Sequence, residues 1–151
     1  MDQILSKIYN IGNYSINLGR ALNDKYIAII EIFTQDGIFI TDFKMSLDTA
    51  KQMYKFLYAL CYDCCCFYYD IPLYNNAYEY IEISGEYKPQ NIDGKEFVLT
   101  IEKINTNGIK STIDIQFSFE EADFFMDKYF EDLLYGYVDD EYVDEILYNI
   151  I

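Results

Sequence analysis

Hydrophobic and polar positions along the chain predict two β-hairpins, each followed by a helix. Residues 26–34 are mostly apolar and rich in isoleucine, which is typical of a buried strand. An Asp36-Gly37 turn follows, and residues 38–45 predict the returning strand. Ser46 is then placed to cap a helix that runs from residue 47 to about residue 60.

The second half of the chain repeats this order of elements. Residues 97–104 and 111–117 predict two strands joined by an Asn107-Gly108 turn, and Ser118 and Glu121 form a capping box that opens a helix over residues 119–134. The offset between the halves is 71 residues up to the turn and 72 after it. The matched pairs are Ile30 and Ile101, Glu31 and Glu102, Gly37 and Gly108, Asp42 and Asp114, Ser46 and Ser118, and Ala50 and Ala122.

Upstream of each hairpin, residues 14–19 also resemble residues 80–85. Together with the matched pairs, this resemblance indicates an internal duplication. The expected fold class is α+β, with duplicated β-β-β-α units that form one six-stranded, mainly antiparallel sheet with the helices packed on it. The alternative is that two unrelated hairpin–helix units merely share turn and cap chemistry. The expected organisation is a single compact domain, 1–151, with repeats over 1–62 and 77–135, a Cys/Tyr-rich connector over 63–76, and a C-terminal acidic helix over 137–151.

This plan of strands followed by a helix, duplicated in one chain, resembles small single-strand-binding folds such as PUR repeats. The resemblance implies a basic, aromatic sheet face that contacts nucleic acid. The charge of this chain departs from that pattern, since its 26 acidic residues outnumber 11 basic ones and give a formal net charge of −15. We therefore expect no direct nucleic-acid binding, because phosphate binding needs a basic face.

Composition narrows the chemistry further. The 151 residues include no histidine, which removes the commonest general base and the histidine-containing zinc sites. We expect no enzyme activity, no catalytic residues, no metal site and no cofactor. Neither a signal peptide nor a long apolar run is present, so we expect a cytoplasmic protein, or one that acts in the cytoplasm of a host cell. The 17 tyrosines suit a protein interface, although an A·T-rich coding bias also explains them.

Two side-chain clusters are candidates for chemistry. Four cysteines fall within six residues (Cys61, Cys64, Cys65 and Cys66), next to a helix C-terminus. We interpret them as small buried residues that end the helix, with metal binding between molecules as the alternative. Glu31 and Glu102 occupy equivalent strand positions, so an approach across a pseudo-two-fold axis is the alternative to two solvated side chains. Asp42 and Asp114 have the same two interpretations.

The acidic residues concentrate near the C-terminus, where residues 120–151 hold 11 acids and one lysine. Like charges four residues apart on a helix oppose folding, so we interpret these acids as a docking surface for a basic partner. The alternative is a solvated face that keeps the protein soluble. The candidate partner-binding residues are Glu120, Glu121, Asp123, Asp127, Glu131, Asp132, Asp139, Asp140, Glu141, Asp144 and Glu145, with Tyr135, Tyr137 and Tyr142 as candidate interface aromatics.

The predicted function is that of a non-enzymatic acidic inhibitor of a basic, nucleic-acid-handling effector or nuclease. Such a protein would occupy the positively charged groove of its partner, as phage anti-CRISPR proteins and other nucleic-acid mimics do. One alternative is a bacterial immunity protein that neutralises a toxin. Another is an assembly protein that forms a homodimer through Val143, Ile146, Leu147 and Ile150 of its C-terminal helix.

Overall fold

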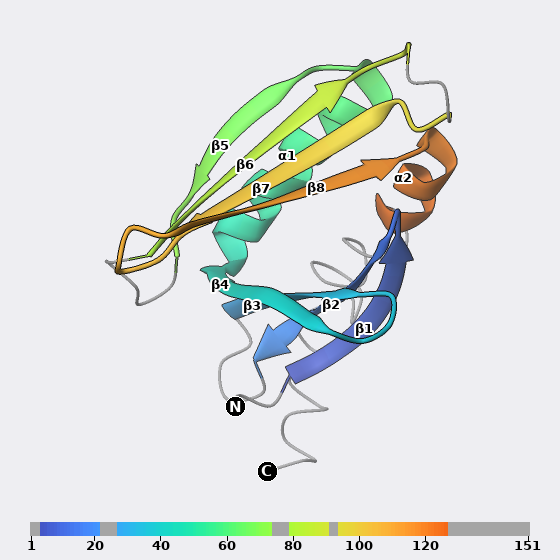
Figure 1. Cartoon of the computed structure of the whole chain (residues 1–151). Helices are drawn as coiled ribbons and strands as arrows, with labels where there is room; N and C mark the ends of the chain where they lie inside the picture. The colour runs from blue at the N-terminus through green and yellow to red at the C-terminus, as the bar shows by residue number, and fades with distance from the viewer. Residues whose placement is uncertain (1–3, 22–26, 74–78, 91–93, 127–151) are drawn as a thin grey trace.

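The computed structural model describes residues 4–21, 27–73, 79–90 and 94–126 and shows an α+β fold of two sheets and two helices (Figure 1). The first half of the chain contains β1 (Ile4–Ile11), β2 (Tyr14–Ala21), β3 (Ile27–Thr34), β4 (Phe39–Ser46) and α1 (Leu47–Asp63). The second half contains β5 (Phe67–Ile71), β6 (Tyr80–Tyr87), β7 (Phe97–Ile104), β8 (Lys110–Phe117) and α2 (Phe119–Phe125).

Each half forms its own four-stranded antiparallel sheet, in the order β1-β2-β3-β4 and β5-β6-β7-β8. The expectation of one six-stranded sheet built from three-stranded units is therefore wrong. Each unit has one more strand than predicted, because β1 precedes the predicted first strand and β5 lies inside the predicted connector, residues 63–76. The aromatic residues of β5 favour a strand, but its neighbouring cysteines and Pro72 suggested a loop.

The two β-hairpin turns are built in the same way. The backbone N–H of Thr34 donates to Ile38 O (2.8 Å) in the first turn, as that of Asn105 donates to Ile109 O (3.0 Å) in the second. Gly37 and Gly108 both adopt positive φ angles, 88° and 79°, which glycine tolerates best. The offset of 71 residues predicted for the turns is thus confirmed in their backbone geometry.

The ladders that leave these turns differ in register. A bulge between Ile32 and Phe33 of β3 interrupts the first hairpin, whereas the second is continuous. As a result Glu31 lies opposite Asp42, but Asp114 lies opposite Thr100. The predicted equivalence of Asp42 and Asp114 therefore fails at the level of strand pairing.

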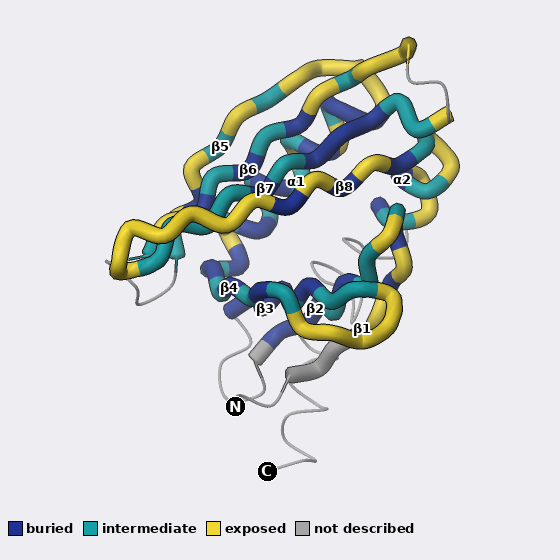
Figure 2. Tube along the Cα trace, viewed as in Figure 1, coloured by how far each residue is buried: buried dark blue, intermediate teal, exposed yellow. Residues whose placement is uncertain are grey.

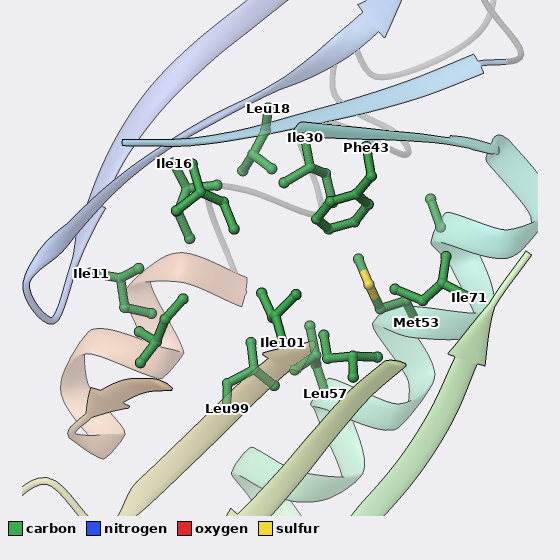
Figure 3. Close-up of a cluster of buried hydrophobic side chains, with 14 of the residues drawn as sticks. Ile11, Ile16, Leu18, Ile30, Phe43, Met53, Leu57, Ile71, Leu99 and Ile101 are labelled. Carbon is green, nitrogen blue, oxygen red and sulfur yellow. The ribbon is translucent and has the colours of Figure 1, made fainter. Parts of the chain in front are cut away.

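Each helix contacts the first strand of the other half. α1 packs against β3 and β4 of its own half and also against β5 and β6, whereas α2 packs against β1 and α1. One continuous cluster of buried side chains consequently contains residues from both sheets and both helices. Figure 3 shows this core, with Leu18, Ile30 and Phe43 of the first sheet facing Leu99 and Ile101 of the second. We call the side of each sheet that faces this core the inner face, and the opposite side the outer face.

Helix α1 begins and ends with ordinary capping chemistry. The Ser46 hydroxyl accepts a hydrogen bond from the Thr49 N–H (3.1 Å), so the predicted cap is confirmed. The helix continues to Asp63, beyond the expected end, and Cys64 closes it in the left-handed conformation with φ 54°.

No helix in the described part of the chain is long and apolar enough to cross a membrane. The predicted C-terminal helix, 137–151, lies outside the described residues.

Candidate functional site

The start of α2 is where the structure describes the predicted acidic surface. Ser118 and Glu121 form the predicted capping box, in which the Glu121 N–H donates to Ser118 Oγ (3.2 Å) and the carboxylate accepts from the Ser118 N–H (3.2 Å). The same carboxylate accepts a hydrogen bond from the Gly12 N–H (2.8 Å) and forms an ion pair with Lys95. Glu121 thereby ties the β1–β2 turn to the second half of the chain.

These contacts determine the charge state of Glu121. Partial burial by itself would raise the pKa of the carboxyl, but the hydrogen bonds from Lys95, Gly12 and Ser118 outweigh it and hold the pKa below the usual glutamate value. These contacts within the fold explain why a glutamate occupies position 121. The predicted role of Glu121 in partner binding stays a prediction.

Glu120 and Asp123 are exposed on α2. Asp123 accepts a hydrogen bond from the hydroxyl of Tyr62 on α1. Partial burial and this hydrogen bond together raise the pKa of the Tyr62 phenol above its usual value. Tyr62 also contacts the Phe119 ring edge-on (centroids 5.8 Å apart), so α1 and α2 are joined at the surface by two aromatic side chains and a carboxylate.

The other predicted site residues are not among those that the structure describes. Outside the described residues lie Asp127, Glu131, Asp132, Asp139, Asp140, Glu141, Asp144, Glu145, Tyr135, Tyr137 and Tyr142.

A second acidic surface, which the sequence reasoning missed, lies on the outer face of the second sheet. Asp70, Glu82 and Glu102 lie opposite one another on β5, β6 and β7 and form what we call the acidic row. Alternation places them outside, since their neighbours Ile71, Ile81 and Ile101 are buried on the inner face. Figure 2 shows the same alternation of buried and exposed residues along β8.

Few positive charges balance the acidic row. The Lys110 ammonium lies 3.1 Å from the Glu102 carboxylate, and both side chains are partly exposed. Hydrogen bonds to Glu82 and Asp70, together with some burial, raise the pKa of the exposed Tyr68 phenol above its usual value. Among the residues that the structure describes, the row is therefore bordered by Lys110 and Tyr68.

Two more carboxylates extend the same face. Asp114 on β8 accepts a hydrogen bond from Thr100 (2.7 Å) and is exposed. Glu86 on β6 forms an exposed ion pair with Lys88 (3.3 Å). In β5–β8, Lys110 is the one positively charged side chain on the outer face. The same face carries five carboxylates, those of Asp70, Glu82, Glu86, Glu102 and Asp114.

The alternative of an approach between Glu31 and Glu102 does not occur, and the favoured interpretation of two solvated side chains is confirmed. Glu31 lies on the outer face of the first sheet and accepts a hydrogen bond from Asn17 (2.7 Å), whereas Glu102 lies on the outer face of the second sheet. Because both inner faces meet in one core, the two carboxylates point away from each other. Two separate, partly solvated glutamates are what the structure shows.

The cysteine cluster divides into one buried and three exposed residues. Cys61 packs in the core, where burial raises the pKa of its thiol to about 12, with the Asp123 carboxylate as a smaller cause. Cys64, Cys65 and Cys66 are exposed beyond the end of α1. The interpretation of all four as buried is wrong for these three, because they follow the last turn of α1 and lie beyond the helix face that packs in the core.

Comparison with known proteins adds no assignment. No protein family matches the chain, and no curated protein is similar to it.

Proposed function

We propose that this chain is a non-enzymatic acidic binding protein that inhibits a nucleic-acid-handling protein by occupying its positively charged groove. The observation that carries the proposal is the acidic row of Asp70, Glu82 and Glu102. Like charges directly opposite one another on neighbouring strands oppose folding. A positively charged partner would remove this repulsion when it binds.

The geometry of the row suits such a partner. Its three carboxylates lie on adjacent antiparallel strands, and neighbouring strands are about 4.8 Å apart. The row therefore carries about one carboxylate per 4.8 Å, whereas one DNA strand carries one phosphate per about 3.4 Å of helix axis. Opposite charge would also accelerate the encounter with a basic groove. An anti-CRISPR protein or another phage anti-defence inhibitor is the first candidate that we propose within this class.

A bacterial immunity protein that neutralises a toxic nuclease would use the same surface, so it is the same proposal with a different partner. Self-association through the C-terminal helix depends on residues outside the described part of the chain. We place it second, because no described contact favours it.

The test is affinity capture from the cells in which the protein acts, followed by a nucleic-acid-binding assay of the captured protein. The wild-type chain is compared with the triple variant Asp70→Asn, Glu82→Gln, Glu102→Gln. We expect wild type to displace nucleic acid from the captured protein, with a steep loss of affinity in salt, and the triple variant to fail.

A matched control removes the same number of charges elsewhere. Asp36, Asp48 and Asp63 are exposed in the first half of the chain, and their triple asparagine variant should behave as wild type. If the two triple variants bind equally well, or if the captured protein does not bind nucleic acid, the proposal is wrong.

A further inference from the structure

A cleft of about 380 Å³ opens between the β3–β4 end of the first sheet and the β7–β8 end of the second. Residues 39–42 of β4 form one side and residues 111–113 of β8 form the other. Ile101 and Lys103 of β7 form part of its floor, and Glu79 lies at its border. We call this feature the edge cleft.

The residues that line the edge cleft show that it runs along the margins of two sheets. Successive residues of a strand point to opposite faces, so a surface lined by four successive residues of β4 follows the edge of that strand. The same holds for β8. Both strands are terminal in their sheets, and along the described chain each pairs with a neighbour on one side only. Terminal strands direct unpaired backbone N–H and C=O groups outward. In Figure 1 β8 forms the border of the upper sheet and β4 the front border of the lower sheet.

A backbone acceptor in the edge cleft already has a substitute donor. The Lys103 ammonium donates to the backbone carbonyl of Asp42 (3.2 Å) and lies 3.5 Å from the Glu79 carboxylate. A lysine on a flexible stem thus reaches across from the second sheet to an acceptor on β4. An incoming backbone N–H could take its place, and Lys103 would keep Glu79 as its partner.

A buried hydroxyl in the same wall has no hydrogen-bond partner among the described residues. Thr41 is 7% exposed, and its Oγ1 atom is buried and unsatisfied. Burying a hydroxyl without a partner destabilises a fold. A polar ligand in the cleft would supply the partner that this hydroxyl lacks.

We propose that the edge cleft binds an extended peptide segment of a partner protein, which adds to β4 as a further strand. The peptide backbone would supply the donors and acceptors that Thr41 and the β4 edge lack. Its alternate side chains would contact Ile101 and Ile113 on the inner side, while the others would face the outer side, beside the Asp42 carboxylate and its cross-strand neighbour Glu31. The segment that fits is therefore one that alternates between apolar and basic residues. This proposal is independent of the acidic row.

The probe is a blocked five-residue peptide that alternates lysine and isoleucine, titrated into the full-length protein and followed by NMR. Two control peptides of identical charge carry N-methyl groups on either all lysine or all isoleucine backbone nitrogens, so that each removes the N–H donors along one edge. We expect saturable binding with amide shifts at residues 39–42 and 110–113. At least one N-methylated peptide should lose about tenfold or more in affinity. Absent binding, shifts elsewhere, or equal binding by all three peptides would overturn the proposal.

Thr41→Val separates a ligand-binding hydroxyl from a merely unsatisfied one. We expect this variant to unfold at a higher temperature than wild type and to bind the peptide about tenfold more weakly. Thr100→Val removes a threonine hydroxyl on the outer face, away from the cleft, and should leave peptide affinity unchanged. If Thr41→Val is more stable but binds the peptide as wild type does, the proposal fails. If sedimentation shows a dimer that the peptide dissociates, the cleft belongs to a second copy of this chain and the proposal is likewise overturned.

Discussion

Glu82 and Glu102 lie directly opposite each other on β6 and β7, with both carboxylates on the outer face of the second sheet. Asp70 lies opposite Glu82 on its other side, so Glu82 is the central charge of the acidic row. Among the described residues, Glu102 is the one member of the row with a lysine beside it, Lys110 at 3.1 Å. Along the described part of the chain, the repulsion at Glu82 is therefore opposed by a hydrogen bond from the neighbouring Tyr68 alone.

Replacing Glu82 by glutamine should stabilise the isolated protein. The substitution removes the central like charge while keeping a hydrogen-bond acceptor for Tyr68, so we expect the free energy of unfolding to rise by about 0.5 kcal/mol. Urea denaturation at low salt measures this change. The gain should shrink in about 0.5 M salt, because salt screens exposed charges. Glu86→Gln, which instead breaks an exposed ion pair with Lys88, should give no gain. A Glu82→Gln variant that is less stable than wild type would contradict a repulsive row.

Glu121 should make the fold sensitive to acid. Its folded-state pKa lies below the unfolded value, so its contribution to stability is present above the unfolded pKa and is lost as the pH falls through the folded pKa. We expect Glu121→Gln to lose about 1 kcal/mol at pH 7, because the capping box and the Gly12 contact both weaken. Below the folded-state pKa of Glu121 the variant and wild type should converge. Urea titrations at both pH values test this, with the exposed Glu120→Gln as the control; a loss that does not vary with pH would exclude a role for the charge.

Gly12 should tolerate no side chain. Its φ is +58°, and a Cβ atom there would lie 2.6 Å from the backbone oxygen of Gln116 in β8. We expect Gly12→Ala to lose about 2 kcal/mol or more in stability, since left-handed strain adds to a clash with backbone. Gly94 is the matched control, because its φ is +69° but a Cβ atom would meet nothing within 4 Å. Gly94→Ala should lose only about 1 kcal/mol. Equal losses would show that the β1–β2 turn does not press against β8.

The cysteines should react in two classes. Cys64, Cys65 and Cys66 are exposed, whereas burial raises the pKa of Cys61 to about 12 and excludes reagents. A thiol titration of the native, reduced protein at pH 8 should therefore show three rapidly reacting groups and a fourth only in denaturant. Folding favours the neutral thiol of Cys61. The stability that this thiol contributes is therefore lost as the pH rises above the usual cysteine pKa towards the folded-state pKa of about 12. Rapid reaction of all four groups would mean that Cys61 lies outside the core.

Local chemistry explains why the turns and helix starts were predictable. Gly37 and Gly108 adopt a positive φ angle that other residues adopt only under strain. The hydroxyls of Ser46 and Ser118 accept hydrogen bonds from N–H groups of the helices that they cap. These requirements involve residues fewer than five positions apart. The prediction of both hairpins and of both helix N-termini therefore needed no knowledge of the rest of the fold.

Strand pairing was decided at longer range. β5 holds its place because Phe67–Ile71 pairs with β6 and buries Ile71, which a Cys- and Tyr-rich sequence followed by proline does not reveal. The acidic row joins residues that are 12 and 20 positions apart, and only the register of the second sheet brings them together. A ladder shifted by one residue would send one of these carboxylates to the opposite face.

The sequence by itself thus determined the α+β class, the two matched turns, the helix caps and the excess of acidic residues in the second half of the chain. Tertiary structure alone decided that there are two sheets and that each helix packs against strands of the other half. It also decided that the edges of β4 and β8 border one cleft. The physical reason is that turns and caps satisfy hydrogen bonds between near neighbours in the chain. Sheet order, register and edge exposure instead depend on which distant apolar faces are buried together.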